Sequence, residues 1–316
     1  MYKKTKIITY LHQRKIMKIL CIGGCGYIGS RLFEELSKAH DVTSVDVGWF
    51  GLYNKHNYKT NYNDLPTPFV QDFDAVILTA AHSSVPMCNE DKIGAIENNI
   101  DNFINLTRKL NKSQKFIYAS SSCVYISTDG RDAVESDKLC PNDMLSFSKT
   151  TTDHYLACFN PCEWYALRFG SVNGYSANYR TDLMLNAMSL KGIKDGVLQV
   201  SNANNYRPIL GMNDLVKGVR AIVESSDDKR GVYNMASFNT RIGDAASAVS
   251  EILKCKIDEL PGNPSYDFTI SSEKFSKAFD FTFVETVQSI VQSIANHKDE
   301  VINKKFPARK VNERNV

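Results

Sequence analysis

Short apolar runs that alternate with helical segments constrain this chain more than any other feature. Four runs, each of the type that is buried on both faces of a parallel sheet, occupy residues 18–22, 42–46, 75–79 and 115–119. Amphipathic spacing follows the first run and recurs in 96–110. This alternation predicts an α/β fold, a doubly wound parallel sheet whose ligands lie beyond the carboxyl ends of the strands.

The pattern divides the chain into four parts. Residues 1–16 form an extension with only weak alternation, and residues 17–174 carry the strands and helices just described. Polar loops among short helices are typical of residues 175–297, where we expect a variable substrate pocket and some elements that return to the first domain. The polar, basic end at 298–316 is expected to be a flexible tail.

Composition argues against several classes of protein. The chain has 38 Lys and Arg against 35 Asp and Glu, and residues 1–16 hold five of the basic ones, so the body is near neutral and offers no basic surface for nucleic acid. No apolar run reaches the roughly 18 residues of a membrane span, and the basic N-terminus lacks the apolar segment of a secretory signal. We therefore expect a cytoplasmic protein with no membrane partner. The eight cysteines include no CxxC pair, which argues against a zinc site.

Gly23, Gly26 and Gly29 have GxxGxxG spacing between the first strand and the first helix. Glycine lets the backbone approach a ligand closely, and the helix N-terminus then points at a pyrophosphate. Asp46 ends the second run, where its carboxylate is placed to accept hydrogen bonds from an adenosine ribose and to repel a ribose phosphate. The sequence therefore predicts a site for NAD in preference to NADP.

Seven motifs then occur in an order that identifies a family. They read GGCGYIGS, VILTAAHSSV, ENNIDNFINL, FIYASSSCVY, SFSK, LRFGSVNG and RPILGMNDL, within residues 18–283. In order and position they resemble the extended short-chain dehydrogenase/reductase family, the NAD-dependent epimerases and dehydratases of nucleotide sugars. The resemblance implies a Rossmann domain, a smaller C-terminal substrate domain, and a homodimer packed through helices near 93–110 and 146–159.

The resemblance also assigns residues to the cofactor. Tyr27 and Ile28 belong to the glycine turn, and Ala80 and Ala81 are expected to pass near the cofactor. Asp64, in the sequence NDL, resembles the family's acid beside the adenine. For Ala80, Ala81 and Asp64, a role in packing or in a turn is the alternative interpretation.

One catalytic position departs from the family. By resemblance, Ser121 orients the reacting sugar oxygen, and Lys149 binds the nicotinamide ribose and favours the tyrosinate of a Tyr-x-x-x-Lys pair. Leu145 stands where that tyrosine is expected, and its side chain cannot transfer a proton. The proton transfer that the family assigns to this tyrosine therefore cannot take place at position 145.

Three explanations of the leucine stay open. Another residue takes the proton, with Tyr125, His82, Cys123 and Ser121 as candidates, or the enzyme works slowly with a tightly held cofactor, or the chain is a catalytically silent binding protein. Cys123 lies in SSCVY, which is similar to a motif of GDP-fucose synthase and GDP-mannose 3,5-epimerase, where a cysteine moves protons beside a keto group. The second acid/base that such an epimerisation requires is not visible.

Four residues are candidates for the substrate. Arg207 in YRP and Arg180 in NYRTDL suit phosphate oxygens, because a guanidinium binds them in bidentate geometry. Asn173 is expected in the loop after a strand, and His82 at a strand end that faces the cleft.

The resemblance and the residues together favour NAD-dependent oxidation or reduction of a nucleotide sugar at C4. A 4-dehydrogenase that yields a 4-ketosugar requires the fewest proton transfers, with a GDP-linked hexose or heptose as substrate and a role in polysaccharide biosynthesis. A 4-epimerase is the alternative enzyme, and a silent NAD-binding sensor is the alternative from another class. Dehydration is disfavoured. At the end of the catalytic strand the 4,6-dehydratases of the family have a sequence similar to Thr-Asp-Glu, whereas this chain has Ser121-Ser122-Cys123.

Overall fold

A parallel sheet forms the centre of the protein. The computed structural model describes residues 15–51, 56–125, 130–262 and 265–303. Within these residues the sheet has the order β10-β6-β5-β4-β1-β2-β3, and every neighbouring pair is parallel. Its strands are β1 (Lys18–Ile22), β2 (Asp41–Val45), β3 (Asn57–Tyr58), β4 (Ala75–Leu78), β5 (Lys115–Ser121), β6 (Glu163–Phe169) and β10 (Gly231–Met235). The predicted α/β fold with a doubly wound parallel sheet is confirmed.

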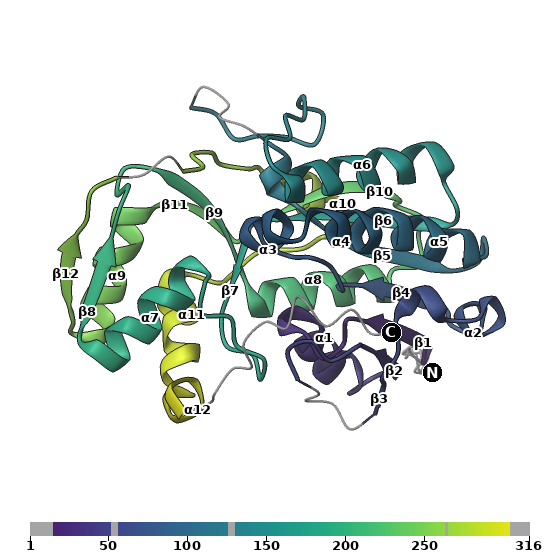
Figure 1. Ribbon diagram of the computed structural model, residues 1–316, viewed down its shortest axis with the longest axis horizontal. Coiled ribbons are helices and arrows are strands. Elements are labelled where there is room, and N and C mark those ends of the chain that lie inside the picture. The colour runs from purple at the N-terminus through teal and green to yellow at the C-terminus, as the bar shows by residue number, and fades with distance from the viewer. Residues whose placement is uncertain (1–14, 52–55, 126–129, 263–264, 304–316) are drawn as a thin grey trace, which may run out of the picture.

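Helices cover both faces of this sheet (Figure 1). Ile19 belongs to the core on one face, which is covered by α1 (Tyr27–Leu36), α8 (Met212–Glu224) and α10 (Glu273–Phe279). Its neighbour Leu20 belongs to the core on the other face, which is covered by α2 (Thr67–Gln71), α5 (Asn102–Lys109) and α6 (Met144–Phe159). Because successive side chains of a strand point to opposite faces, a sheet covered on both sides requires continuous apolar strands.

Two further short helices lead into α5. These are α3 (Val85–Glu90) and α4 (Lys92–Ile96), and a π-helical turn at Glu97–Asp101 joins α4 to α5. Two 3₁₀ turns follow strands of the sheet, at Tyr62–Asp64 and at Ser122–Val124. The second of these turns continues directly from the carboxyl end of β5.

A smaller group of elements lies to one side of the sheet, at the left of Figure 1. Its strands are β7 (Ser171–Asn173), β9 (Tyr206–Gly211) and β11 (Phe238–Arg241) in one sheet, and β8 (Val197–Val200) and β12 (Lys256–Glu259) in another. Its helices are α7 (Met184–Asp195), α9 (Ile242–Leu253), α11 (Val287–Ala295) and α12 (Lys298–Asn303). Helix α12 lies in the part assigned to the tail, yet its Val301 is buried in the core of this group. Residues 1–14 and 304–316 lie outside the described residues.

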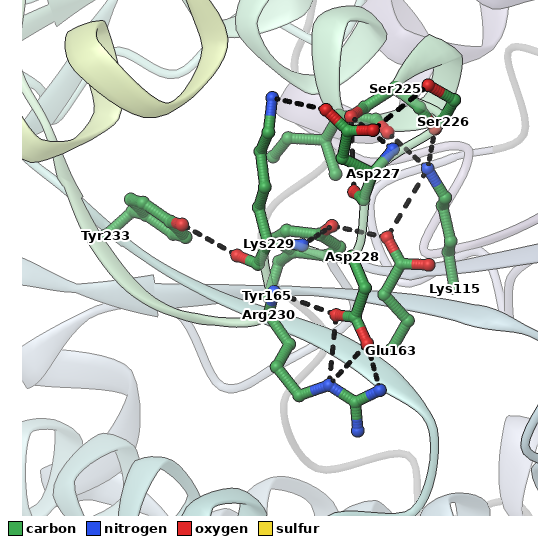
Figure 2. A network of polar contacts seen from close by, with 11 residues as sticks. Lys115, Glu163, Tyr165, Ser225, Ser226, Asp227, Asp228, Lys229, Arg230 and Tyr233 are labelled. Atoms are coloured by element: carbon green, nitrogen blue, oxygen red, sulfur yellow. Dashed lines mark hydrogen bonds and ion pairs between the residues drawn. The ribbon is translucent and has the colours of Figure 1, made fainter.

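A polar network at the amino ends of β5 and β6 fixes the loop between α8 and β10 (Figure 2). The buried Lys115 donates through Nζ to the carbonyl of Ile222, at 2.9 Å, and to that of Ser225. The same Nζ lies 3.5 Å from a carboxylate oxygen of Glu163. Lys115 thus satisfies carbonyl groups that the end of α8 leaves without helical partners.

Replacing Lys115 with methionine is expected to lower the free energy of unfolding by roughly 1–3 kcal/mol. Two carbonyls lose their donor and the Glu163 carboxylate loses its partner. Denaturant unfolding measures the change. Lys38→Met, which removes only an exposed pair with Glu35, is the control and should change stability by less than about 0.5 kcal/mol. Equal losses in the two variants would contradict the assignment.

Two kinds of feature are absent from the described residues. No helix among them is long and apolar enough to cross a membrane. In the same parts of the chain, His, Cys, Asp and Glu side chains form no group of three or more that could hold a metal ion. The eight cysteines carry free thiols.

Candidate active site

The turn between β1 and α1 needs glycine at two positions. Gly23 has a φ of 85°, and a Cβ there would lie 2.5 Å from the backbone nitrogen of Ala80. A Cβ on Gly29 would lie 2.0 Å from the carbonyl oxygen of Gly23. Both contacts are with backbone atoms, so only glycine lets helix α1 approach β1 and β4 this closely.

The amino end of α1 is free to receive a negative group. Its N-cap residue, Gly26, offers no side chain, and the first turn of this helix holds no acidic residue. The backbone N–H groups and the positive end of the helix dipole are therefore not neutralised by side chains of the helix itself. Such an end suits a pyrophosphate.

Asp46 follows β2 and reaches back to the glycine turn. Its Oδ2 accepts a hydrogen bond from the backbone N–H of Cys25 at 3.0 Å, and its Oδ1 accepts one from that of Gly48 at 2.7 Å. Burial raises the pKa of Asp46, and the two backbone hydrogen bonds oppose that shift. These bonds hold the carboxylate beside the turn, as the sequence predicts for a residue that contacts the cofactor.

A cavity of about 260 Å³ lies over the turn, and we call it the glycine-turn cavity. Of the residues predicted for the cofactor, those that line it are Gly23, Gly26, Tyr27, Ile28, Gly29, Asp46, Ala80 and Ala81. Sequence reasoning missed Trp49, Asn61, Tyr62 and Thr79, which also line it. Thr79 was the easiest of these to predict, because it is the last residue of the third apolar run and directly follows β4.

The structure does not place Asp64 at this cavity. Its side chain is exposed, and it ends the 3₁₀ turn that begins at Tyr62. Asn61 and Tyr62 line the cavity instead, and the Tyr62 phenol donates to the carbonyl of Asn98. The turn carries the chain away from the cavity after Tyr62, so the interpretation of NDL as the acid beside the adenine is corrected.

Tyr27 lines the cavity but uses its hydroxyl elsewhere. The hydroxyl donates to the carbonyl of Gly174 at 2.8 Å and accepts from Nδ2 of Asn186 at 3.1 Å. Asn186 lies in α7, so the phenol joins α1 to the smaller group of elements. Only its ring remains for a contact with a ligand.

A second cavity, of about 740 Å³, lies where β5 and β6 end, and we call it the strand-end cavity. Ser121, Cys123, Leu145 and Lys149 all line it. The two cavities adjoin, because they share the lining residues Tyr27, Ile28, Thr79, Ala81, Ser83, Arg180 and Asp182. All the predicted cofactor residues except Asp64, and all the predicted catalytic residues except Tyr125, thus face one continuous space.

Helix α6 positions Lys149. Asp143 caps the helix, since its Oδ1 accepts from the backbone N–H of Ser146 at 2.9 Å. Lys149 is buried, and its Nζ donates to the carbonyl of Ala119 at 2.7 Å and lies 4.5 Å from the centre of the Tyr118 ring. Burial lowers the pKa of Lys149 to about 8, and the charge of Asp153 opposes that shift.

Leu145 lies one helical turn before Lys149 and faces the same cavity. It packs with Val85, Cys88 and Ala95 and is only 8% exposed. An aliphatic side chain therefore occupies a position from which a longer polar side chain would reach the cavity.

Ser121 and Cys123 lie at the end of β5. The Ser121 Oγ accepts from the backbone N–H of Cys123 at 3.3 Å. Burial raises the pKa of the Cys123 thiol to about 12, although its contact with the Ser121 side chain opposes this. Cys123 is therefore a neutral thiol near pH 7, unsuited to accept a proton.

Two candidate proton acceptors lie away from both cavities. Tyr125 is buried, and its hydroxyl donates to Asn234 at 2.8 Å and accepts from Arg168 at 2.6 Å. His82 is 2% exposed and lies 3.5 Å from Asp91, and burial lowers its pKa. His82 therefore does not face the cleft as the sequence suggested, and Tyr125 does not reach it as a proton acceptor would, because each side chain is enclosed by its own polar partners.

Asn173 is also corrected, because it is structural. It lies in β7 rather than in a loop and is fully buried. Its Oδ1 accepts from the backbone N–H of Leu185 at 2.9 Å, and its Nδ2 donates to the carbonyl of Ser171 at the same distance. Asn173 thus caps the first turn of α7 and lines neither cavity.

The two predicted arginines do face the strand-end cavity. Arg180 pairs with Asp182 at 2.7 Å and reaches Ser83 at 3.4 Å, so it bridges the two cavities. Arg207 donates to the carbonyl of Tyr266 and to the side chain of Ser265. Tyr266 lines the strand-end cavity as well and was missed, since no motif marks it.

Known proteins share both this sequence pattern and this fold. Residues 19–236 match the family described as the NAD dependent epimerase/dehydratase family. The chain belongs to the NAD-dependent epimerase/dehydratase family. NAD, the cofactor predicted from the glycine turn and Asp46, is confirmed, and the open amino end of α1 together with the glycine-turn cavity fits a dinucleotide.

Members of the family differ in the reactions they catalyse. A UDP-glucose 4-epimerase from Lactobacillus helveticus is 27% identical over 177 residues, which cover 51% of this chain and 54%, about half, of the epimerase. The UDP-glucuronic acid 4-epimerase of Bacillus cereus, solved with UDP-glucuronic acid and NAD, has a TM-score of 0.78 at 20% identity and covers 91% of this chain and 99% of its own. The NDP-hexosamine 5,6-dehydratase TunA has a TM-score of 0.80 at 16% identity, covering 91% and 100%. At these identities the structural matches show the fold alone.

Proposed function

We propose that the protein uses NAD to oxidise a hydroxyl of a nucleotide sugar, at C4, and releases a 4-ketosugar. One observation carries the proposal: the glycine-turn cavity opens into the strand-end cavity, where Ser121 and Lys149 face the same space. NAD, when bound, accepts the hydride that such an oxidation releases. The second cavity is large enough for a sugar and part of its nucleotide.

Each polar residue of the strand-end cavity has a role in this proposal. Ser121 binds the reacting oxygen, since its side chain lines the strand-end cavity at the end of β5. Lys149 holds the cofactor ribose and supplies positive charge that favours loss of the hydroxyl proton. Arg180 and Arg207 line the cavity where phosphate oxygens of the nucleotide are to be bound.

Net oxidation is favoured over epimerisation because of Leu145. An epimerase must return the hydride to the opposite face of the same carbon and give the proton back to its oxygen within one catalytic cycle, whereas a dehydrogenase releases its ketone after a single proton transfer. A GDP-linked hexose or heptose is the first substrate class to test, on the similarity of SSCVY around Cys123. A 4-epimerase remains the second candidate, because the Lactobacillus helveticus relative is one.

A spectroscopic assay distinguishes these functions. The purified protein is mixed with NAD and, in turn, GDP-mannose, UDP-glucose and UDP-glucuronic acid, while the reduced-nicotinamide absorption band is followed and the sugars are analysed. The proposal predicts a rise in the band together with a ketosugar. A changed sugar without a net rise would favour the epimerase. Bound NAD with no change in either signal would favour a silent binding protein.

We also propose that the protein forms a homodimer through α4 and α6. These helices lie on one face of the sheet (Figure 1) and expose large apolar side chains, among them Ile93 at 63%, Phe147 at 45% and Phe159 at 45%. Exposed apolar groups on adjacent helices mark an interface rather than a solvated surface. The surface coincides with the helices named by the family resemblance.

Phe147→Glu combined with Ile93→Glu is expected to convert the dimer to a monomer. Burying the new carboxylates between two copies would be strongly unfavourable. Sedimentation equilibrium of both proteins measures the mass. A control pair, Ile257→Glu with Leu260→Glu, changes exposed apolar residues near β12, outside this surface, and should leave the mass unchanged. A monomeric parent protein would contradict the proposal.

A further inference from the structure

Tyr266 brings a phenol to the strand-end cavity from a distant part of the chain. It lines the cavity together with Ser121, Leu145 and Lys149. Its hydroxyl donates a hydrogen bond to Oδ2 of Asp143, the residue that caps α6 two positions before Leu145. The Tyr266 phenol therefore contacts the amino end of α6, where Leu145 provides no proton acceptor.

The carboxylate of Asp143 is held in place as the hydrogen-bond acceptor of the phenol. Its Oδ1 is held by the backbone N–H of Ser146, so the carboxylate lies at the positive end of the α6 dipole. The side chain is only partly buried, which gives it access to solvent for the later loss of the proton. The Cys123 thiol and the Arg207 guanidinium are the other titratable groups that act on the phenol.

The segment that carries Tyr266 is fixed by β9 and the residue before it. The Arg207 guanidinium and Nδ2 of Asn205 both donate to the Tyr266 carbonyl, the second at 3.2 Å. The backbone N–H of Tyr206 donates to Oδ1 of Asp267 at 2.7 Å. Arg207 thus acts on the position of this segment as well as facing the cavity.

We propose that Tyr266 and Asp143 form the proton relay that replaces the missing tyrosine, an inference that rests on the proposed function. The sugar hydroxyl gives its proton to Oη of Tyr266 while the phenol gives its own proton to Oδ2 of Asp143. The O–H bond of the sugar breaks, a carboxylic acid forms at Asp143, and the phenol is regenerated. The carbon that bears this hydroxyl loses a hydride, which NAD accepts in the proposed oxidation.

A relay fits this phenol better than a stable tyrosinate. Burial and the bond to Asp143 raise the pKa of Tyr266 above its usual value, whereas the Arg207 charge opposes this. The phenolate is therefore scarce near neutral pH. A transfer in which Tyr266 gains and loses a proton together does not require the phenolate to accumulate.

Two conservative variants test the relay in the full chain. Tyr266→Phe removes the hydroxyl, and Asp143→Asn removes the carboxylate while keeping an oxygen that caps α6. With NAD and GDP-mannose, UDP-glucose or UDP-glucuronic acid, each variant should lower kcat by roughly 10²–10⁴-fold and change KM by less than about threefold. The control is Tyr175→Phe. The Tyr175 hydroxyl also donates to a carboxylate, that of Glu300, but it lies outside both cavities. The kcat of this variant should equal that of the parent.

Rescue separates chemistry from structure. Leu145→Tyr added to Tyr266→Phe restores a phenol one turn before Lys149 and should recover at least about tenfold of the lost kcat. A parent that turns over while Tyr266→Phe retains its kcat would overturn the relay and leave the proposed function intact.

A second readout does not depend on turnover. 3-Fluorotyrosine placed at position 266 should shift its fluorine resonance when NAD and a bound sugar nucleotide are added, and should shift again in Asp143→Asn. If no sugar is turned over, the proposed function is contradicted independently of the relay. The fluorine resonance then tests whether the phenol faces the ligands. Movement on ligand binding supports a phenol that faces the ligands, and an unchanged resonance at saturation overturns it.

Discussion

Lys149→Met is expected to lower turnover by roughly 10²–10⁴-fold and to make the protein more stable near pH 7. The amine is buried against the Ala119 carbonyl in the strand-end cavity, where the proposed function needs its charge. Burial lowers its pKa from 10.5 to about 8, so the folded protein keeps an ammonium below pH 8 at a cost in stability. Methionine removes that cost, and opposite changes in activity and stability are the expected result.

The sign of the pH dependence follows from the direction of this shift. Between pH 8 and 10.5 the unfolded chain binds the proton that the folded chain has lost, so this lysine contributes stability that rises with pH over that window. The advantage of Lys149→Met, roughly 1–3 kcal/mol near pH 7 after the loss of one hydrogen bond, should shrink over the same window. Denaturant unfolding at several pH values measures it.

Lys115→Met is the matched control, because Lys115 is also buried but begins β5, at the opposite end of that strand from the strand-end cavity. Burial lowers the pKa of Lys115 as well. However, Lys115→Met breaks hydrogen bonds to two carbonyls and an ion pair with Glu163, so this variant should lose stability and keep its kcat. A Lys149→Met variant that loses stability as Lys115→Met does, and retains turnover, would show that Lys149 is a structural residue.

Gly29→Ala is expected to weaken NAD binding at least about 100-fold, a change of roughly 3 kcal/mol. The new Cβ would lie 2.0 Å from the Gly23 carbonyl oxygen and 2.7 Å from its carbonyl carbon, both backbone atoms that cannot rotate away. Either α1 moves away from β1 or the turn opens, and both changes displace the N–H groups that are to hold the pyrophosphate. Titration calorimetry with NAD measures the loss.

Gly26→Ala is the graded control for stability. A Cβ there would approach the same carbonyl oxygen only to 3.2 Å, a contact that small shifts relieve. Gly29→Ala should therefore lower the thermal unfolding midpoint by several degrees more than Gly26→Ala does. Equal midpoints for the two variants would contradict the close packing of α1 on the turn.

The central sheet was predictable because its signal is local. The run Lys18–Ile22 is apolar on both faces, and the glycine turn and helix follow it without a gap, so the order of elements and the site for NAD could be inferred from one segment. Asp46 was found by the same logic, as the residue that directly follows the next strand.

The substrate side was less predictable because its contacts are long-range. Asn173 was expected in a loop, but it ends β7 and caps α7, a role that depends on how the two elements meet. Tyr125 lies close in sequence to Ser121, yet the 3₁₀ turn between them directs its hydroxyl to Arg168 and Asn234. Tyr266 meets the cavity only because β9 holds its segment there, and no spacing in the sequence records that contact.

Transfer of deuterium from the sugar to the cofactor tests the central claim most directly. The protein is incubated with NAD and, separately, with GDP-mannose or UDP-glucose labelled with deuterium at C4, and the cofactor is released and analysed by mass spectrometry. Hydride transfer at C4 predicts that deuterium appears on the nicotinamide with at least one sugar, and that Lys149→Met abolishes the transfer. A label that stays on both sugars while they are bound at saturation would contradict it.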